Sequence, residues 1–240
     1  MSDYNTSVFE ASLCELGFKP DSDVIDKYIT YYRLLTEWNQ KINLTAITEF
    51  DEVFKKHFID CLSIVKAFDL NKINSLIDVG CGAGFPGLVL KIMYPHLSLT
   101  LLDSLNKRIN FLKLVADELN LTDIDFIHGR SEDFGRNSDY REKFDVCTSR
   151  AVANMSTLSE LCIPFVKVGG KFIAYKGDCL EELNSSQNAL KILGCDKPTV
   201  VSFNLPSSDM GRTIVLCDKI KPCPKTYPRK AGTPSKSPIS

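Results

Sequence analysis

Apolar residues recur every three or four positions through the first part of the chain. After Asp21 they fall at Val24, Ile25, Tyr28, Ile29, Tyr32, Leu35 and Trp38. A second stretch, from Glu52 to Phe68, repeats the pattern, and each stretch would place its apolar side chains on one face of an α-helix. The polar residues 39–45 between them are typical of a turn. We therefore predict that residues 1–72 form a helical N-terminal extension.

After residue 72 the pattern changes to short apolar runs that alternate with helical segments. The predicted strands are 75–79, 97–102, 124–127, 144–148, 171–175, 199–203 and 213–217. The predicted helices are 88–93, 107–119, 158–166 and 180–193. This alternation predicts an α/β domain, residues 73–218, with a mostly parallel seven-stranded sheet and helices on both faces. The short connection between the last two strands predicts an antiparallel pair at one edge.

The remaining region, residues 219–240, has six basic residues, five prolines and no acidic residue. It is either a disordered tail or a basic strap. The whole chain balances 29 Lys and Arg against 30 Asp and Glu, which excludes a protein that holds nucleic acid by bulk charge alone. Its hydrophobic content of 44% excludes disorder over the full length.

The cysteines and the apolar runs argue against a disulfide-bonded, metal-binding, membrane-spanning or secreted protein. The cysteine count is odd, at nine, no CxxC occurs, and the three histidines are scattered, so we expect neither disulfides nor a metal site. No apolar run approaches the roughly 20 residues of a membrane span, and the first residues lack the features of a signal peptide. We predict a reduced, metal-free, monomeric protein of the cytoplasm that does not associate with membranes.

A glycine-rich loop, Asp78-Val79-Gly80-Cys81-Gly82-Ala83-Gly84-Phe85-Pro86-Gly87, follows the first predicted strand of the sheet. Ligands of open parallel sheets bind at this edge, where glycines let the backbone approach them closely. The loop departs from the dinucleotide-binding pattern, because Phe85 replaces its last glycine and Pro86 has no N–H for a phosphate. Asp78 would repel a diphosphate and attract a cationic ligand. A plain tight turn is the alternative.

Asp103 ends the second predicted strand, where its carboxylate can accept hydrogen bonds from two ribose hydroxyls. Together with the acidic glycine loop, it favours a nucleoside that carries positive charge and no phosphate, which describes S-adenosylmethionine. Gly80 and Gly82 are the loop positions where the backbone would approach such a ligand.

Two further polar positions follow predicted strands. After the third strand, a backbone N–H near Ser131 and the Glu132 carboxylate could bracket the edge of an adenine. The alternative is a solvated turn in which Ser131 or Asp133 caps a helix. After the fourth strand, Arg150 could pair with a carboxylate such as the methionine end of the cofactor, and its alternative role is a structural ion pair.

The end of the fourth predicted strand also limits the reaction. Ser149-Arg150-Ala151 stands where methyl transfer to an exocyclic amine usually needs a Pro-Pro loop, and Cys147 lies within the strand rather than beside a proline. The acceptor that remains has its own lone pair, and guanine N7 is one. We therefore expect no catalytic general base and a barrier lowered by positioning alone. A protein without enzymatic activity would show the same absence.

Basic residues gather toward the end of the chain. Lys176 closes the fifth predicted strand, Arg212 precedes the seventh, and Arg229 and Lys230 lie near Tyr227 in the last region. Lys and Arg interleaved with Tyr suit RNA phosphates and an exposed base, so we predict RNA contacts here. A solvated tail is the alternative.

Taken together, these motifs resemble one family. They are Trp38-Asn39, residues 43–47, residues 57–62, the glycine loop, Asp103-Ser104, Lys107-Arg108, Phe111-Leu112, residues 149–153, Lys176-Gly177 and residues 227–234. Over roughly residues 38–239 the chain is similar to the RsmG (GidB) methyltransferases. The resemblance implies a class I, Rossmann-like, S-adenosylmethionine-dependent methyltransferase fold. It also implies methylation of guanine N7 at one guanosine in the 530 loop of 16S rRNA, in the 30S subunit.

The resemblance also implies particular cofactor contacts. They are Gly80, Phe85, Ser131, Glu132 and Arg150. Ser131 stands where the family usually has Ala, a change that should matter little to a backbone contact. Cys81 stands where Ser or Thr is common, which we expect to make the loop sensitive to oxidation. A non-catalytic ribosome-assembly factor and a small-molecule methyltransferase remain as alternatives on the same fold.

Overall fold

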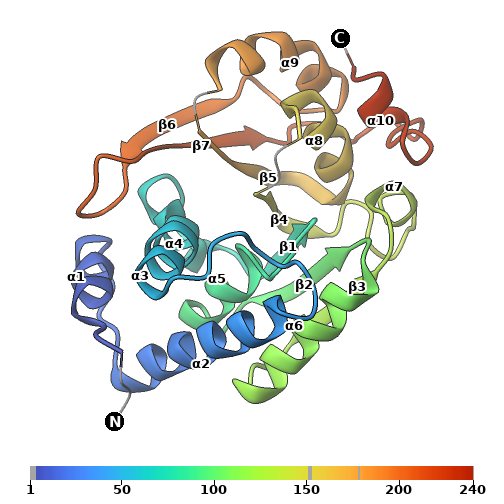
Figure 1. The fold of residues 1–240 in the computed structure, drawn as a ribbon. Helices are drawn as coiled ribbons and strands as arrows, with labels where there is room; N and C mark the ends of the chain where they lie inside the picture. The colour runs from blue at the N-terminus through green and yellow to red at the C-terminus, as the bar shows by residue number, and fades with distance from the viewer. Residues whose placement is uncertain (1–3, 151–152, 178, 240) are drawn as a thin grey trace.

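The computed structural model describes residues 4–150, 153–177 and 179–239. Within these ranges one seven-stranded sheet has the order β3-β2-β1-β4-β5-β7-β6 (Figure 1). The strands are β1 Ser75–Val79, β2 Ser98–Asp103, β3 Ile124–His128, β4 Phe144–Ser149, β5 Val166–Lys176, β6 Thr199–Asn204 and β7 Gly211–Asp218. The first five pair in parallel, and β7 is antiparallel to both β5 and β6. The predicted α/β fold and its antiparallel edge are confirmed.

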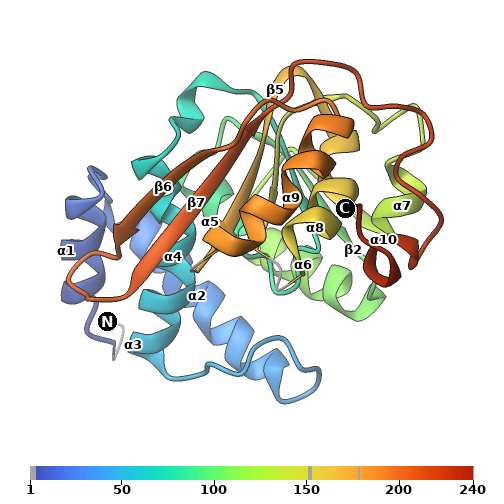
Figure 2. The same ribbon diagram turned by 90° about the horizontal axis from the view of Figure 1, so that it is seen from above.

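Helices cover both faces of the sheet (Figures 1 and 2). They are α5 Gly87–Met93 and α6 Asn106–Glu118 on one face, and α7 Ser131–Phe134, α8 Met155–Cys162 and α9 Leu180–Ile192 on the other. Neighbours along β1 point to opposite faces, so Leu76 joins one apolar core and Ile77 the other, both fully buried. Burial on both faces explains the nearly continuous apolar runs of the parallel strands.

The N-terminal extension is helical but less regular than predicted. Its elements are α1 Ser7–Glu15, α2 Ser22–Asn39, α3 Phe50–Val53, a π-helix Phe54–Ile59, α4 Asp60–Leu62 and two 3₁₀-helices, Ser63–Lys66 and Leu70–Lys72. The helix predicted from Glu52 to Phe68 is present as one continuous helical run over residues 50–66, but it contains a π turn and ends in a 3₁₀ turn. In the wider π turn the N–H of Asp60 bonds to the Lys55 carbonyl. The Lys56 carbonyl accepts a hydrogen bond from Arg150 instead, at 3.1 Å.

The extension and the sheet share one apolar core. Tyr28 and Tyr31 of α2 are fully buried in it. The Tyr28 hydroxyl donates to the Val89 carbonyl in α5 at 2.9 Å, and the Tyr31 hydroxyl donates to the Ala83 carbonyl in the glycine loop. Burial raises the pKa of both phenols well above their ordinary value, so both remain O–H donors. The extension thereby fixes the position of the glycine loop.

The C-terminal residues pack along the side of the molecule that carries α7 and α8 (Figure 2), and end in α10, Thr233–Lys236. The Arg141 guanidinium donates to the carbonyls of Gly135, Tyr227, Cys223 and Pro224, at 2.7 to 3.2 Å. Residues 219–239 therefore form a strap that packs against the domain, rather than a disordered tail. No helix in the part of the chain described is long and apolar enough to cross a membrane.

Replacing Arg141 should release this strap. Arg141→Ala removes charge-assisted hydrogen bonds to several carbonyls, so we expect the free energy of unfolding to fall by about 2–4 kcal/mol. Trypsin should then cut after Lys225 and Lys230 in the otherwise folded protein. Lys143→Ala, an exposed neighbour, should change neither result. Full trypsin protection in Arg141→Ala would show that other contacts hold the strap.

Candidate functional site

The loop between β1 and α5 depends on glycine at three positions. Gly80, Gly82 and Gly84 have φ values of +71°, +58° and +95°, a region that other residues rarely adopt. The N–H of Gly80 bonds to the Leu102 carbonyl at 2.9 Å. A Cβ at Gly84 would collide with the Tyr31 hydroxyl. The loop is thus shaped by its own glycines and by the extension behind it.

A pocket of about 340 Å³ opens beside the glycine loop, at the carboxyl ends of β1 to β4. Four predicted cofactor contacts line it: Gly80, Asp103, Ser131 and Glu132. Gly82 and Phe85 belong to the loop but not to this lining, and Arg150 lines a second pocket.

The Asp103 carboxylate is held firmly at the end of β2. Its Oδ2 accepts a hydrogen bond from the Gly82 N–H and its Oδ1 one from the Leu105 N–H, both at 2.9 Å. Arg108 Nη1 lies 3.4 Å from Oδ2. Each carboxylate oxygen can accept more than one hydrogen bond, so this oriented carboxylate fits a ligand that offers two neighbouring hydroxyls.

Asp78 lies beneath the loop rather than in the pocket. Its Oδ2 accepts a hydrogen bond from the Gly87 N–H at 2.8 Å, while its buried Oδ1 has no partner among the described residues. Burial raises the pKa of this carboxyl to about 7. Asp78 therefore fixes the start of α5 and does not line the pocket. Its unpartnered oxygen still fits a cationic ligand nearby, which would offset the buried negative potential.

Ser131 and Glu132 form the start of α7. The helix is capped at Arg130 without a side-chain hydrogen bond, so the alternative of a cap at Ser131 or Asp133 is wrong. Glu132 Oε1 accepts a hydrogen bond from the Gly232 N–H at 2.9 Å. The strap thus contacts a residue that lines the pocket.

Cys81 is among the eight buried cysteines, and only Cys14 is exposed. Burial raises the pKa of the Cys81 thiol well above its ordinary value, which suppresses the reactive thiolate. The structure thus argues against the expected sensitivity of the loop to oxidation while the protein is folded.

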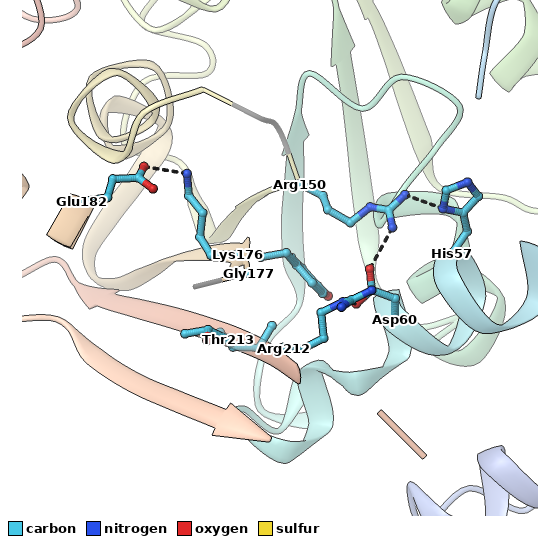
Figure 3. A pocket seen from close by; sticks show the side chains of 10 residues that line it. His57, Asp60, Arg150, Lys176, Gly177, Glu182, Arg212 and Thr213 are labelled. Carbon is cyan, nitrogen blue, oxygen red and sulfur yellow. Dashed lines mark hydrogen bonds and ion pairs between the residues drawn. The ribbon is translucent and has the colours of Figure 1, made fainter. Parts of the chain in front are cut away.

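Arg150, directly after β4, joins the sheet to the extension (Figure 3). Its Nη1 lies 3.0 Å from Asp60 Oδ2, and its Nη2 lies 3.1 Å from His57 Nδ1. The guanidinium lies over the Phe85 ring at 5.1 Å, and the His57 ring stacks on Phe85 at 4.6 Å. The structure therefore shows the ion pair that was the alternative role of Arg150. A guanidinium has five N–H donors, so a ligand carboxylate could still use those left free.

A second pocket, of about 460 Å³, lies at the ends of β5 and β7. Its lining includes Arg150, Lys176, Arg212, His57, Asp60 and Glu182 (Figure 3). Arg212 Nε bonds to Asp60 Oδ1 at 2.8 Å, so Asp60 binds both arginines. Lys176 Nζ lies 2.7 Å from Glu182 Oε1.

The predicted RNA contacts divide into two groups. Lys176 and Arg212 meet in this second pocket, whereas Arg229 and Lys230 line neither pocket. The Arg229 guanidinium is bound to the fully buried carboxylate of Glu160, with Nη2 2.6 Å from Oε2. Lys230 is exposed.

His57 and Asp60 were not among the candidate site residues, although they belong to a motif of the resemblance. The signal that could have found them is polarity: two ionisable residues interrupt the apolar pattern of Phe54, Phe58 and Cys61. An acid buried in such a helix needs a charged partner, and Arg150 and Arg212 supply it.

His57 is held neutral at physiological pH. Burial, reinforced by the Arg150 guanidinium, lowers the pKa of its imidazole to about 4. Its Nε2 lies 2.8 Å from Thr45 Oγ1, and its Nδ1 can accept from Arg150. The His57 imidazole of the unfolded chain becomes protonated near pH 6.5, whereas that of the folded protein does so only near pH 4. The contribution of neutral His57 to the free energy of unfolding is therefore fully present above pH 6.5 and is lost as the pH falls toward 4.

We expect the difference between the pKa of His57 in the unfolded chain and in the folded protein to lower the free energy of unfolding by about 2 kcal/mol between pH 7.5 and pH 5. His57→Gln should lack that part of the pH dependence, whatever its stability at pH 7.5. Denaturant unfolding at both pH values measures the effect. His96→Gln, which changes an exposed histidine, should keep the full pH dependence, and an equally steep loss in His57→Gln would contradict the assignment.

Comparison with known proteins shows the family. The model of the family described as rRNA small subunit methyltransferase G (GidB) matches residues 24–210. A protein of that name from Clostridium perfringens is 52% identical over 93% of this chain and 94% of its own length. One from Alkaliphilus metalliredigens is 51% identical over 94% of this chain and 95% of its own.

The fold is also found among solved structures. An S-adenosylmethionine-dependent methyltransferase from Aquifex aeolicus superposes with a TM-score of 0.52 and 14% identity, over 77% of this chain and 98% of that one. The sheet order with its antiparallel β7 is thus the class I methyltransferase fold, as predicted. The chain belongs to the rRNA small subunit methyltransferase G family.

Proposed function

We propose that this protein transfers the methyl group of S-adenosylmethionine to N7 of one guanine in the 530 loop of 16S rRNA. Its class, an S-adenosylmethionine-dependent rRNA methyltransferase, follows from its family. The observation that carries the finer proposal is the pair of adjoining pockets. Ala153, which lines the first pocket, accepts a hydrogen bond from Lys176 of the second at 2.7 Å.

The first pocket suits the cofactor. Asp103 would hold the ribose, and the backbone at Gly80 and Gly82 would allow close approach. Ser131 and Glu132 would contact the adenine, and Arg150 would reach the methionine carboxylate from the neighbouring second pocket. Phe85 would act through Arg150, because its ring lies under that guanidinium. When bound, the cofactor supplies a methyl group on a positively charged sulfur.

The second pocket supports transfer without a general base. Guanine N7 has a lone pair and no proton to lose. His57 is neutral, but both of its ring nitrogens lie within hydrogen-bond distance of other groups. Both oxygens of Asp60 accept from arginines. These residues are therefore suited to position a base rather than to remove a proton.

The RNA would be held by side chains at the second pocket and on the strap. Lys176 and Arg212 would act at the pocket and Lys230 on the strap, while Arg229 would contact RNA only through donors that Glu160 leaves free. The substrate in this proposal is the 30S subunit or its 16S RNA, and the protein acts as a monomer.

Methyl transfer to 30S subunits that lack the modification tests the function. With labelled cofactor, the protein should place one N7-methylguanosine in the 530-loop fragment, identified by mass spectrometry. Binding to the subunit without methyl transfer would instead indicate an assembly factor. Transfer only to a small molecule would indicate the other alternative.

Asp103→Asn tests whether the first pocket binds the ribose of the cofactor. We expect it to weaken S-adenosylmethionine binding by at least about tenfold, because a ribose hydroxyl loses a charged acceptor. Calorimetry measures the affinity, and a thermal melt checks that the fold is kept. An unchanged affinity would show that Asp103 does not bind the ribose.

Lys230→Gln should weaken binding to 16S RNA in a salt-dependent manner. One lost phosphate contact should reduce the slope of log K against log salt by about one. Lys72→Gln is the matched control, because Lys72 is exposed just before β1, at the opposite end of the strands. A slope equal to that of the unchanged protein would show that Lys230 does not contact an RNA phosphate and is a solvated side chain.

A further inference from the structure

Lys176 and Glu182 form an ion pair whose hydrogen-bonding capacity is only partly used. Lys176 ends β5 and Glu182 lies in the first turn of α9, so both stand at the ligand-binding edge of the sheet (Figure 3). Lys176 Nζ donates to the Ala153 carbonyl and to Glu182 Oε1, each at 2.7 Å. An ammonium has three N–H donors, so one remains. Glu182 Oε2 has no hydrogen-bond partner among the residues described.

The pocket around this pair is nearly balanced in charge. Its cations are Arg150, Lys176 and Arg212, and its carboxylates are Asp60 and Glu182. Asp60 already neutralises much of the charge on the two arginines. A phosphate would meet the Glu182 carboxylate and be repelled. A neutral ligand with both donors and acceptors suits the pocket better.

Guanine has that combination on one edge. Its O6 accepts a hydrogen bond, and the adjacent N1–H and N2–H groups donate. A free ammonium N–H beside a carboxylate matches this order, with Lys176 opposite O6 and Glu182 opposite N1 and N2. Adenine has the reverse order at the first two positions, so an N–H would face the ammonium and a lone pair would face the carboxylate. Bases drawn out of a helix are commonly recognised on this edge.

We propose that the Lys176–Glu182 pair recognises the guanine that is to be methylated, with Glu182 as the residue that selects it. This rests on the proposed function. Contact at O6, N1 and N2 leaves N7, on the other edge of the base, without a hydrogen bond and free to react. The Lys176 bond to Ala153 keeps the pair at the border of the cofactor pocket.

The test combines one variant with one altered base. Inosine differs from guanosine only by lacking the N2 amino group. Small subunits are reconstituted with guanosine or inosine at the methylated position, and single-turnover methylation is measured for the unchanged protein and for Glu182→Gln. The unchanged protein should prefer guanosine by about tenfold or more, because inosine lacks one hydrogen bond to a carboxylate. In Glu182→Gln the preference should fall to within about twofold.

Glu181→Gln is the matched control, because Glu181 is an exposed neighbour in the same helical turn. It should keep the full preference for guanosine. Affinity for S-adenosylmethionine should be the same in all three proteins, because neither glutamate lines the first pocket. A purely structural role of Glu182 would slow both substrates equally and leave their ratio unchanged.

The outcomes separate the two proposals. If the unchanged protein forms no N7-methylguanosine, the proposed function fails. If it forms this product and Glu182→Gln keeps the preference for guanosine over inosine, the function stands and Glu182 is not the selecting residue.

Discussion

The buried guanidinium of Arg150 is the interaction on which the site depends. Arg150 directly follows β4, and its guanidinium donates hydrogen bonds to Asp60 and to the Lys56 carbonyl of the extension. A buried charge is tolerable only with such partners, so the sheet and the extension must pack together for either to be satisfied. The same group lies over the Phe85 ring. One side chain therefore joins the sheet to the extension and to the Phe85 end of the glycine loop.

Much of the fold was predictable because local sequence and topology agree. Each parallel strand is a short apolar run buried on both faces, and the glycine loop marks where the first one ends. The π turn at Phe54–Ile59 was not predictable from the local pattern, because the group that satisfies its Lys56 carbonyl is Arg150, 94 residues later in the chain. The strap was equally hidden, since the backbone contacts of Arg141 leave no trace in the local pattern.

The sequence predicted the lining of the first pocket, the one we propose for the cofactor, better than that of its neighbour. Gly80, Asp103, Ser131 and Glu132 follow directly from strand ends, and parallel strands bring their ends to one edge. Arg150, Lys176 and Arg212 were noted singly, but only the structure shows that they share a pocket with acids. Whether a basic residue is free for RNA depends on its partner, as the contrast between Arg229 and Lys230 makes plain.

The distribution of cysteines gives the protein a built-in set of probes. Cys14 alone is exposed, while Cys61, Cys81, Cys147 and Cys217 lie in the extension, the glycine loop and two strands. In the folded protein a thiol reagent reaches one site, and every further label marks a segment that has opened. Labelling followed by peptide mapping would therefore rank these regions by local opening, with no need to engineer reporters.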